Sequence, residues 1–362
     1  MEYGQPLGKD AVLKTGASYS LMGNELFFLE YDRVDQERYM HIDERTTLGD
    51  LRMFQAYAQS LWTVNSKLSL TLGLNYLHFS LNGSSAFNYS VAGAYQINKK
   101  NGVSLSIGKY AQVIPIGTYF TGEDNLDLSL MKSYQVNAAY GWQLANDFKV
   151  GVEGYYQKLY NIPISKDEEV DYWMLNDLVG FSTDNLSSDG RGRNYGLEMT
   201  LERFFNQGFF MLISGSVYNS EYSLRGDDYF NSRYNGRFNS SLMMGKEIML
   251  KNENILSLSF RNLVFGGQWY KPPDDFISRS IDEYFEQENS NLTLQNKTYW
   301  RSDLRVSYRK NNPHNSWILA LDVQNLFNIS NTRGEIFNIK DQLYQTKLQG
   351  GIVPVVSFQL DI

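Results

Sequence analysis

Few side chains in this sequence could carry out catalysis or bind a metal. The chain has no cysteine and 3 histidines. His41, His78 and His314 lie in separate segments, at spacings that suit neither a metal site nor a catalytic triad. The acidic run from Asp167 to Asp171 could bind calcium, but it lacks the alternating spacing of calcium-binding loops, which favours a solvated loop. We therefore expect no enzyme active site, no bound metal and no cofactor.

Charged residues that alternate with apolar ones are more informative about the elements that hold them. Glu198 and Glu202 alternate with apolar neighbours, and so do Arg305 and Arg309. The same period of two recurs along the chain, for example from Leu68 to Tyr76, and it indicates strands with two unlike faces. The strands are about 10 to 14 residues long, whereas a tilted strand needs about nine to eleven residues to cross a bilayer.

Short turns and longer polar segments alternate between these strands, which predicts a membrane barrel with its turns on one side and its loops on the other. The short turns are expected near Leu21–Asn24, Val64–Ser66, Asn98–Gly102, Ala145–Asp147, Asn206–Gly208, Met249–Asn254 and Asn311–Asn315. The longer segments are Arg33–Gly49, Leu81–Ser85, Ile114–Leu130, Ile162–Arg191, Glu221–Asn235, Gly266–Lys297 and Asn328–Gly350. The best helical candidate, Ile281–Glu288, lies within one of these loops.

The composition agrees with a membrane barrel. Aromatic residues make up 15% of the chain, with 26 tyrosines and 21 phenylalanines, and they cluster near both ends of the expected strands, as in interfacial girdles. No apolar run reaches the roughly 18 residues of a transmembrane helix. The net charge of −7 argues against nucleic acid as a partner. The residues after Met1 do not resemble a signal peptide, so we expect the natural start to lie upstream.

An ordered set of segments resembles the C-terminal barrel of TonB-dependent outer-membrane receptors. The most specific is Gly190–Phe205 (GRGRNYGLEMTLERFF), followed by Tyr234–Glu247, Leu321–Asn328 and Gly351–Ile362. The likeness is greatest to Bacteroidetes-type receptors, which carry a carboxypeptidase-regulatory-like domain before the plug. It implies an all-β, antiparallel, up-and-down transmembrane β-barrel with short periplasmic turns and long extracellular loops. Residues 1–362 would then supply about 15 of roughly 22 strands, while the plug, the signal peptide and the first strands are absent.

The resemblance implies active transport of a nutrient across the outer membrane of a Gram-negative bacterium. The nutrient class stays open among iron chelates, cobalamin, oligosaccharides and similar compounds. The implied partners are outer-membrane lipid, the plug and through it TonB, the barrel-assembly machinery and a surface lipoprotein. Residues expected to contact the substrate from the three longest loops, unless they pack their own loops instead, are Tyr172, Trp173, Phe181, Trp269, Tyr270, Arg333 and Tyr344. Glu198, Glu202, Arg305 and Arg309 are expected to line the lumen and to pair with each other or with the plug.

Two other classes of protein fit part of the pattern. An outer-membrane barrel enzyme would need a nucleophile, a histidine and an acid near one rim, and only His78 lies near a loop-side strand end. An extracellular carbohydrate-binding or adhesive β-protein would have polar residues on both faces of its edge strands and no apolar band of membrane thickness.

Overall fold

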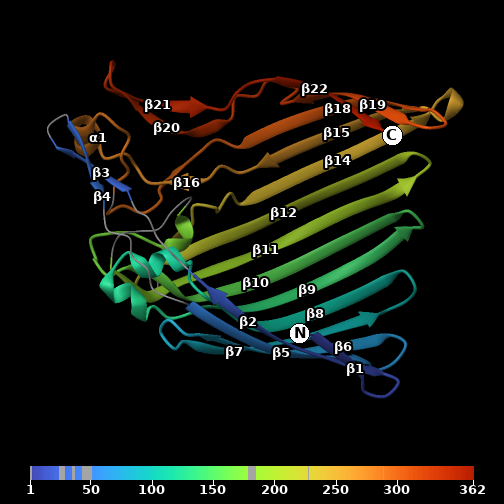
Figure 1. The fold of residues 1–362 in the computed structure, drawn as a ribbon, viewed down its shortest axis with the longest axis horizontal. Coiled ribbons are helices and arrows are strands. Elements are labelled where there is room, and N and C mark those ends of the chain that lie inside the picture. Colours follow the sequence, from blue (N-terminus) through green and yellow to red (C-terminus); the bar gives the residue numbers. More distant parts are fainter. Residues whose placement is uncertain are drawn as a thin grey trace.

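The computed structural model describes residues 2–23, 29–34, 37–42, 51–177, 185–226, 228–287 and 289–362. A single antiparallel sheet of 16 strands dominates these residues (Figure 1). Its continuous order is β1 (Glu2–Pro6), β2 (Ala11–Met22), β5 (Leu51–Thr63), β6 (Leu68–Phe79), β7 (Ser85–Gln96), β8 (Asn101–Gln112), β9 (Met131–Ala145), β10 (Phe148–Ser165), β11 (Leu186–Asn206), β12 (Phe209–Ser223), β14 (Phe238–Met249), β15 (Ile255–Phe265), β18 (Tyr299–Asn311), β19 (Ser316–Gln324) and β22 (Val353–Asp361). Within this sheet each strand pairs with the next strand of the sheet along the chain, which confirms the up-and-down order and the expected number of about fifteen strands.

Smaller elements lie in the long connections. Three two-stranded sheets are formed by β3 (Leu29–Val34) with β4 (Glu37–Ile42), β16 (Trp269–Tyr270) with β17 (Leu294–Gln295), and β20 (Thr332–Asn338) with β21 (Leu343–Leu348), while β13 (Phe230–Asn231) pairs with β12. The helices are α1 (Asp275–Ile281) and the short 3-10 helices η1 (Ile116–Phe120), η2 (Glu123–Asp127), η3 (Met174–Asn176) and η4 (Lys251–Glu253). No helix in the described part of the chain is long and apolar enough to cross a membrane.

The two faces of the large sheet differ in chemistry, as the alternating sequence predicts. On one face Leu72, Val91, Ile107 and Val136 form a row across β6 to β9, and each is 40–49% exposed. The adjacent row, on the other face, holds small and polar residues. Across β5 to β9 these are Gln59, Gly73, Ser90, Gly108 and Gln135. Such exposed apolar side chains are not covered by other parts of the sheet. A barrel wall that faces lipid has this property.

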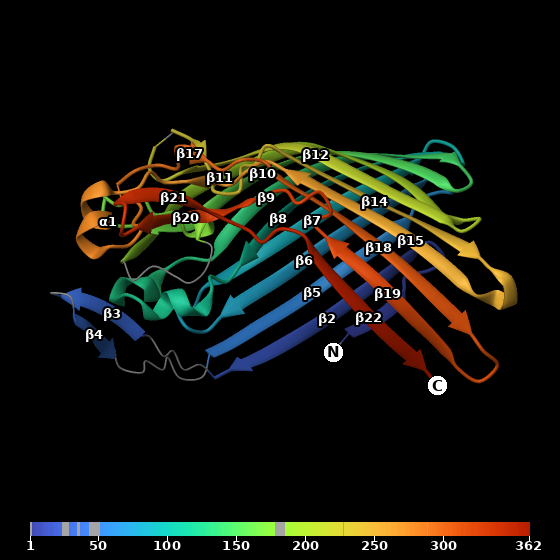
Figure 2. The same cartoon turned by 90° about the horizontal axis from the view of Figure 1, so that it is seen from above.

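The sheet curves into a trough, and its connections are sorted between its two ends (Figures 1 and 2). Turns of a few residues join strands at one end, at 7–10, 64–67, 97–100, 146–147, 207–208, 250–254 and 312–315. The other end carries 23–50, 80–84, 113–130, 166–185, 224–237, 266–298 and 325–352. The strand order of the described residues ends at β1 on one side and at β22 on the other.

Three local expectations were wrong. Of the turn expected at Leu21–Asn24, Leu21 and Met22 lie in β2 and Asn24 lies outside the described residues; the first described turn is at 7–10, where Gly8 has a φ of +83°. The strand expected after that turn corresponds to β3, which pairs only with β4, outside the large sheet. The helix precedes Ile281–Glu288: it begins after Asp274, whose side chain caps Ile277 N at 2.9 Å, and ends before Asp282 in the left-handed conformation.

The strands on either side of the 166–185 connection exceed the expected 10–14 residues: β10 has 18 and β11 has 21. Both extend beyond the apolar band, and their loop-side ends reach a buried cluster that includes Ile162, Ile164 and Leu186. The same cluster contains Trp173, Tyr222 and Leu292 from other loops and strand ends, together with Leu51, Phe79, Ile114, Tyr119, Leu128, Met131, Met174 and Leu224. The hydrophobic core of this chain is therefore at the loop end and not between layers of the sheet.

Candidate functional site

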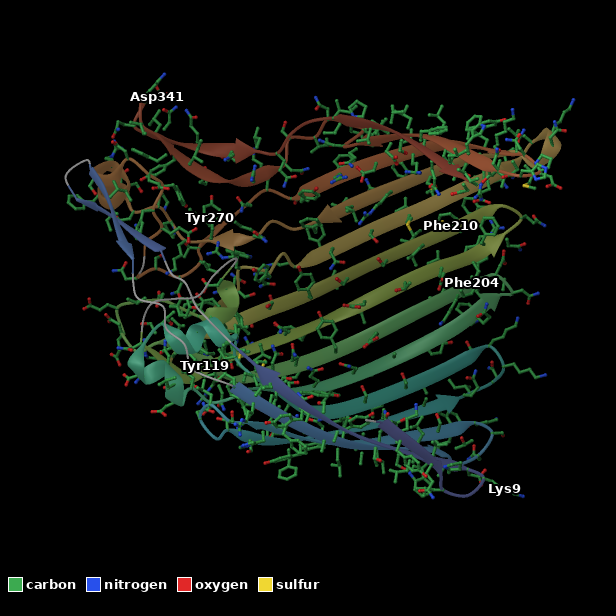
Figure 3. All side chains as sticks on the ribbon, in the orientation of Figure 1. Lys9, Tyr119, Phe204, Phe210, Tyr270 and Asp341 are labelled. Atoms are coloured by element: carbon green, nitrogen blue, oxygen red, sulfur yellow. The ribbon has the colours of Figure 1, made fainter. Side chains whose placement is uncertain are left out.

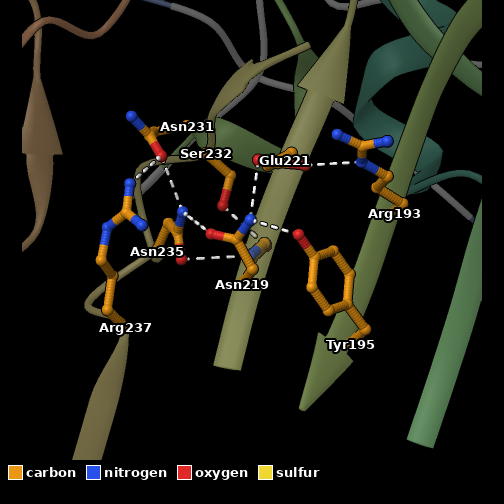
Figure 4. A network of polar contacts seen from close by, with 9 residues as sticks. Arg193, Tyr195, Asn219, Glu221, Asn231, Ser232, Asn235 and Arg237 are labelled. Atoms are coloured by element: carbon orange, nitrogen blue, oxygen red, sulfur yellow. Dashed lines mark hydrogen bonds and ion pairs between the residues drawn. The ribbon is translucent and has the colours of Figure 1, made fainter. Parts of the chain in front are cut away.

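The loop end is organised first by a network of amides and hydroxyls beside β12 (Figure 4). Asn235 is fully buried, and its side chain accepts from Ser220 N at 3.0 Å. Its Nδ2 donates to Asn219 Oδ1 and to Asn231 Oδ1, each at 2.8 Å. Because one side chain satisfies three partners on two segments, it fixes the 224–237 connection against its own strand.

The same network reaches the neighbouring strand β11. Asn219 Nδ2 donates to Tyr195 OH and to Glu221 Oε1, both at 2.7 Å. Glu221 Oε2 accepts from Arg193 Nε at 2.5 Å, and the Arg193 guanidinium lies over the Tyr229 ring. Charged and amide groups thus cross-link β11, β12 and the 224–237 connection at the point where the strands leave the apolar band.

Two tryptophans then join three of the long connections. Trp173 is 5% exposed, and its ring stacks on Tyr222 with centroids 5.2 Å apart and planes at 22°. Trp269 Nε1 donates to Asn235 O at 2.8 Å, and Trp269 N donates to Arg233 O at 2.9 Å. The 166–185, 224–237 and 266–298 connections are held together by these contacts.

A cavity of about 230 Å³ lies among these connections. It is lined by two cationic, three anionic, three aromatic and two other residues, namely Arg233, Lys271, Asp171, Asp177, Glu286, Tyr172, Trp173, Phe285, Asn176 and Leu292. Arg233 Nε donates to Asn176 O at 2.8 Å, and Arg233 Nη2 lies 3.4 Å from Glu286 Oε2. Tyr172 OH donates to Asp177 Oδ2 at 2.7 Å. The lining can therefore offer charge, hydrogen bonds and an aromatic surface together.

Burial changes the titration of the cavity carboxyls. Desolvation raises the pKa of Asp171 above its ordinary value, although the charges of Lys271 and Arg225 oppose the shift. Desolvation also raises the pKa of Asp177, against the opposing hydrogen bond from Tyr172 and the charge of Arg233. Both carboxyl groups are thus partly desolvated, and a cationic or hydrogen-bonding ligand would stabilise their charged forms.

A second group of contacts joins the 266–298 and 325–352 connections. Tyr344 OH donates to Asp275 Oδ1 at 3.0 Å, and the Tyr344 ring meets the Tyr284 ring edge-on at 6.0 Å and 88°. The Phe337 ring packs on Tyr344 at 5.4 Å, and the Arg279 guanidinium lies over Phe337. The β20–β21 hairpin is thereby docked on α1.

Residues 2–326 match the family described as TonB dependent receptor-like, beta-barrel. The chain belongs to this family. A comparison with curated proteins gives no match. The fold is similar to that of known receptors of this kind, all at low sequence identity. Family members are transport receptors of the Gram-negative outer membrane, and this barrel is an outer-membrane protein.

Several solved structures share the fold. The ferric-catecholate import receptor Fiu of E. coli K12 matches with a TM-score of 0.67 and 11% identity, over 99% of this chain and 53% of its own. The pyoverdine-bound FpvA of P. aeruginosa matches at 0.71 and 14%, over 99% and 47%. BauA of Acinetobacter baumannii, a ferric preacinetobactin receptor, matches at 0.64 and 16%, over 100% and 53%. The chain spans about half the length of these receptors.

The loop residues that the sequence suggested as substrate contacts lie in different places in the structure. Tyr172 and Trp173 line the cavity, whereas Trp269 packs against the buried hydrophobic cluster and Tyr270 lies in β16 (Figure 3). Tyr344 holds the β20–β21 hairpin on α1, while Arg333 is exposed on β20 and does not line the cavity. Phe181 lies outside the described residues. Whether these residues contact a substrate stays a prediction.

Sequence reasoning missed most of the charged cavity lining. Asp171 belongs to the acidic run that was noticed, but its partners Arg233 and Lys271 are isolated in the sequence, 62 and 100 positions further on. Only the folding of three connections onto one another brings them together. Among the described side chains, no group of three or more histidine, aspartate or glutamate residues is arranged to hold a metal.

The four charged residues of the strands lie on the polar face of the sheet. Glu198 contributes to a cavity of about 770 Å³ on that face near the short turns, and Glu202 lies opposite Lys149. Arg305 and Arg309 do not pair with the two glutamates: Arg305 Nη1 lies 2.6 Å from Asp322 Oδ2, and Arg309 Nη2 lies 3.5 Å from Asp361 Oδ2. Adjacent strands supply these partners because cross-strand neighbours are only about 5 Å apart.

Proposed function

We propose that this chain forms the wall and the extracellular substrate-binding loops of a receptor that imports a nutrient through the outer membrane by TonB-dependent transport. The observation that carries the proposal is the sorting of the connections. All the long ones lie at one end, where three of them enclose a cavity lined by charged and aromatic side chains, whereas the other end has short turns. The substrate class stays open among iron chelates, cobalamin, oligosaccharides and similar compounds.

In this function the sheet acts as a wall and the loops act as the capture device. Hydrogen bonds between neighbouring strands satisfy the backbone within the hydrocarbon, and the apolar face meets lipid. The polar face, with Glu198, Glu202, Arg305 and Arg309, would line the lumen. Capture by the loop end would use the cavity beside Tyr172 and Lys271. The protein would then be a transporter that carries out no covalent chemistry.

Residues 1–362 would be the C-terminal part of one receptor barrel. A plug domain inside the barrel would couple substrate binding to TonB, and the barrel-assembly machinery would insert the strands. A carboxypeptidase-regulatory-like domain before the plug and a surface lipoprotein over the loops would complete a Bacteroidetes-type receptor. The support for these partners is the resemblance of segments such as Gly190–Phe205 to that group of receptors.

The orientation can be tested by cysteine labelling, because the chain has no cysteine of its own. Asp341 lies exposed at the tip of the β20–β21 hairpin, and Lys9 lies exposed in the first short turn at the opposite end (Figure 3). In intact cells, a membrane-impermeant maleimide should label Asp341→Cys and leave Lys9→Cys unlabelled until the outer membrane is permeabilised. Labelling of Lys9→Cys alone in intact cells would contradict the proposed orientation.

Transport itself can be tested by growth of a strain that lacks the gene, with limiting iron chelate, cobalamin or oligosaccharide as the required nutrient. We expect growth on one of these classes to be lost, to return with the intact gene, and to be lost again when TonB is removed. Growth equal to that of the parent strain on all three classes would refute the proposed import function.

A further inference from the structure

A second kind of pocket lies on the polar face of β5 to β8, within the wall and apart from the loop cavity. Its volume is about 340 Å³, and its lining contains no charged residue. Two adjacent cross-strand rows form it. The first row pairs Tyr57 with Asn75 and Asn75 with Asn88, and the second pairs Gln59 with Gly73 and Gly73 with Ser90. Tyr110 of β8 completes the lining.

Glycines give this pocket its shape. A Cβ on Gly16 would lie 2.5 Å from the Tyr57 ring, and a Cβ on Gly108 would lie 2.5 Å from Tyr110 OH. Both tyrosine rings therefore occupy space that any side chain on these glycines would fill. Gly73 has no side chain to fill the floor between them. The result is a recess with an aromatic ring from β5 and another from β8.

One buried amide in the recess lacks a hydrogen-bond partner. Asn88 is 8% exposed, and its Nδ2 donates to Asn75 Oδ1 at 3.0 Å. Its Oδ1 is buried and accepts no hydrogen bond from the described residues. A buried acceptor left in this state costs about 1–3 kcal/mol, and a bound molecule can donate to it only after the Asn88 side chain rotates toward the recess.

We propose that this recess binds a neutral polyhydroxylated ligand, such as one or two sugar rings. The uncharged lining offers no compensation for the hydration that an ionic ligand would lose on entering. Hydroxyl groups can exchange hydrogen bonds with Gln59 and Ser90 and, once the Asn88 side chain rotates, donate to Asn88 Oδ1, while the apolar face of a sugar ring rests on Tyr57 or Tyr110. A volume at the low end of the roughly 300–1,000 Å³ of small-molecule sites limits the ligand to a small unit.

The position of the recess suits a ligand that arrives from the loop end. On the loop side it adjoins a small apolar cluster of Leu77, Ala86 and Leu130, against which Met53 and Ala111 pack. The recess is thus the next feature of the polar face below the packed loops. This inference rests on the proposed function for the route by which the ligand enters, and it narrows the substrate to a neutral saccharide.

The test uses the complete receptor that contains this chain, purified in detergent micelles, and isothermal titration with neutral disaccharides. The probes are maltose, mannobiose, galactobiose and N,N′-diacetylchitobiose, with digalacturonate as a charged molecule of similar size. We expect at least one neutral probe to bind and digalacturonate to bind at least tenfold more weakly. Tyr57→Ala and Tyr110→Ala should each raise the Kd about threefold to tenfold, and Asn88→Leu about tenfold.

A matched control separates the recess from the general effect of removing a tyrosine. Tyr134 is 40% exposed, close to the 43% of Tyr110, but it lies one strand away on the apolar face. Tyr134→Ala should leave the Kd unchanged, and Tyr110→Phe should keep it within threefold, which shows that the variants fold. Failure of all four neutral probes to bind, or a Kd indifferent to Tyr57→Ala and Tyr110→Ala, would overturn the inference. In that case, TonB-dependent growth on another nutrient would still support the proposed import function. Saccharide binding without any import would refute the proposed import function and leave the recess inference intact.

Discussion

Replacing Trp173 by alanine should loosen the loop end and leave the sheet intact. Trp173 is 5% exposed and stacks on Tyr222 at 5.2 Å. The indole also lies against β11, where a Cβ on Gly190 or Gly192 would be 3.2 Å or 3.1 Å from it. Removal of so buried a tryptophan costs about 3–5 kcal/mol, of which the ring stack accounts for about 0.5–1.5 kcal/mol.

The loss should appear as local opening, because the indole takes no part in the backbone ladder between β10 and β11. Even 3 kcal/mol raises the open population by roughly a hundredfold, since 1.4 kcal/mol is tenfold. The assay is limited trypsin digestion in micelles, which can cleave after Arg233 once the connections open. The cleavage rate at this site should rise by about that factor, while fragments from within the strands stay absent.

The adjacent Tyr172 provides the matched control. Tyr172 is only partly buried, and its hydroxyl donates to Asp177 at 2.7 Å. Tyr172→Ala should cost about 1 kcal/mol or less and accelerate cleavage less than tenfold. If Trp173→Ala leaves cleavage unchanged, or if Tyr172→Ala accelerates it more, then Trp173 does not hold the loops together.

Three further substitutions test other parts of the structure. Gly190→Ala should prevent correct assembly, seen as loss of the heat-modifiable folded band on a gel, because the new Cβ would lie 2.6 Å from Ile162 O. Burial raises the pKa of Asp171, so its contribution to folding stability is present below the ordinary pKa and is lost as pH rises through the pKa of the folded state. Asp171→Asn removes this loss. The variant should therefore resist a pH-insensitive protease better than the parent at neutral pH, and equally well in acid. Arg305→Gln should change the urea midpoint little, by less than about 1 kcal/mol, because its ion pair with Asp322 is partly exposed; a larger loss would show that the pair is buried in the assembled receptor.

The alternating pattern predicted most of the fold because each strand of this wall faces two different environments. Tyr195–Leu201 shows the pattern, and the sheet places Leu197 and Met199 on one face and Glu198 on the other. The prediction placed the first turn at Leu21–Asn24, although the strand continues through Leu21 and Met22, and it passed over the turn at 7–10. Local composition does not show where a strand ends when the pattern continues past a polar residue.

The function of individual aromatic residues was not predictable in the same way. Trp173 and Tyr172 are neighbours in one polar segment, yet one is buried in the loop core and the other lines a cavity beside Asp177. Tyr110 lies near the loop-side end of β8, where girdle aromatics are expected, but it is on the polar face and lines the uncharged recess. A side chain's partners here come from other strands and connections, which the sequence around it does not specify.

The sequence by itself determined the class of protein: a wall of alternating strands with turns at one end and loops at the other. Those features follow from the period of two and from the length of the connections, which are local properties of the chain. Only the tertiary structure decided that Arg233 and Lys271 meet Asp171 in one cavity, and that Tyr57, Asn88 and Tyr110 share another. Such sites depend on cross-strand register and on the docking of connections far apart in the sequence, and these arise only when the whole sheet assembles.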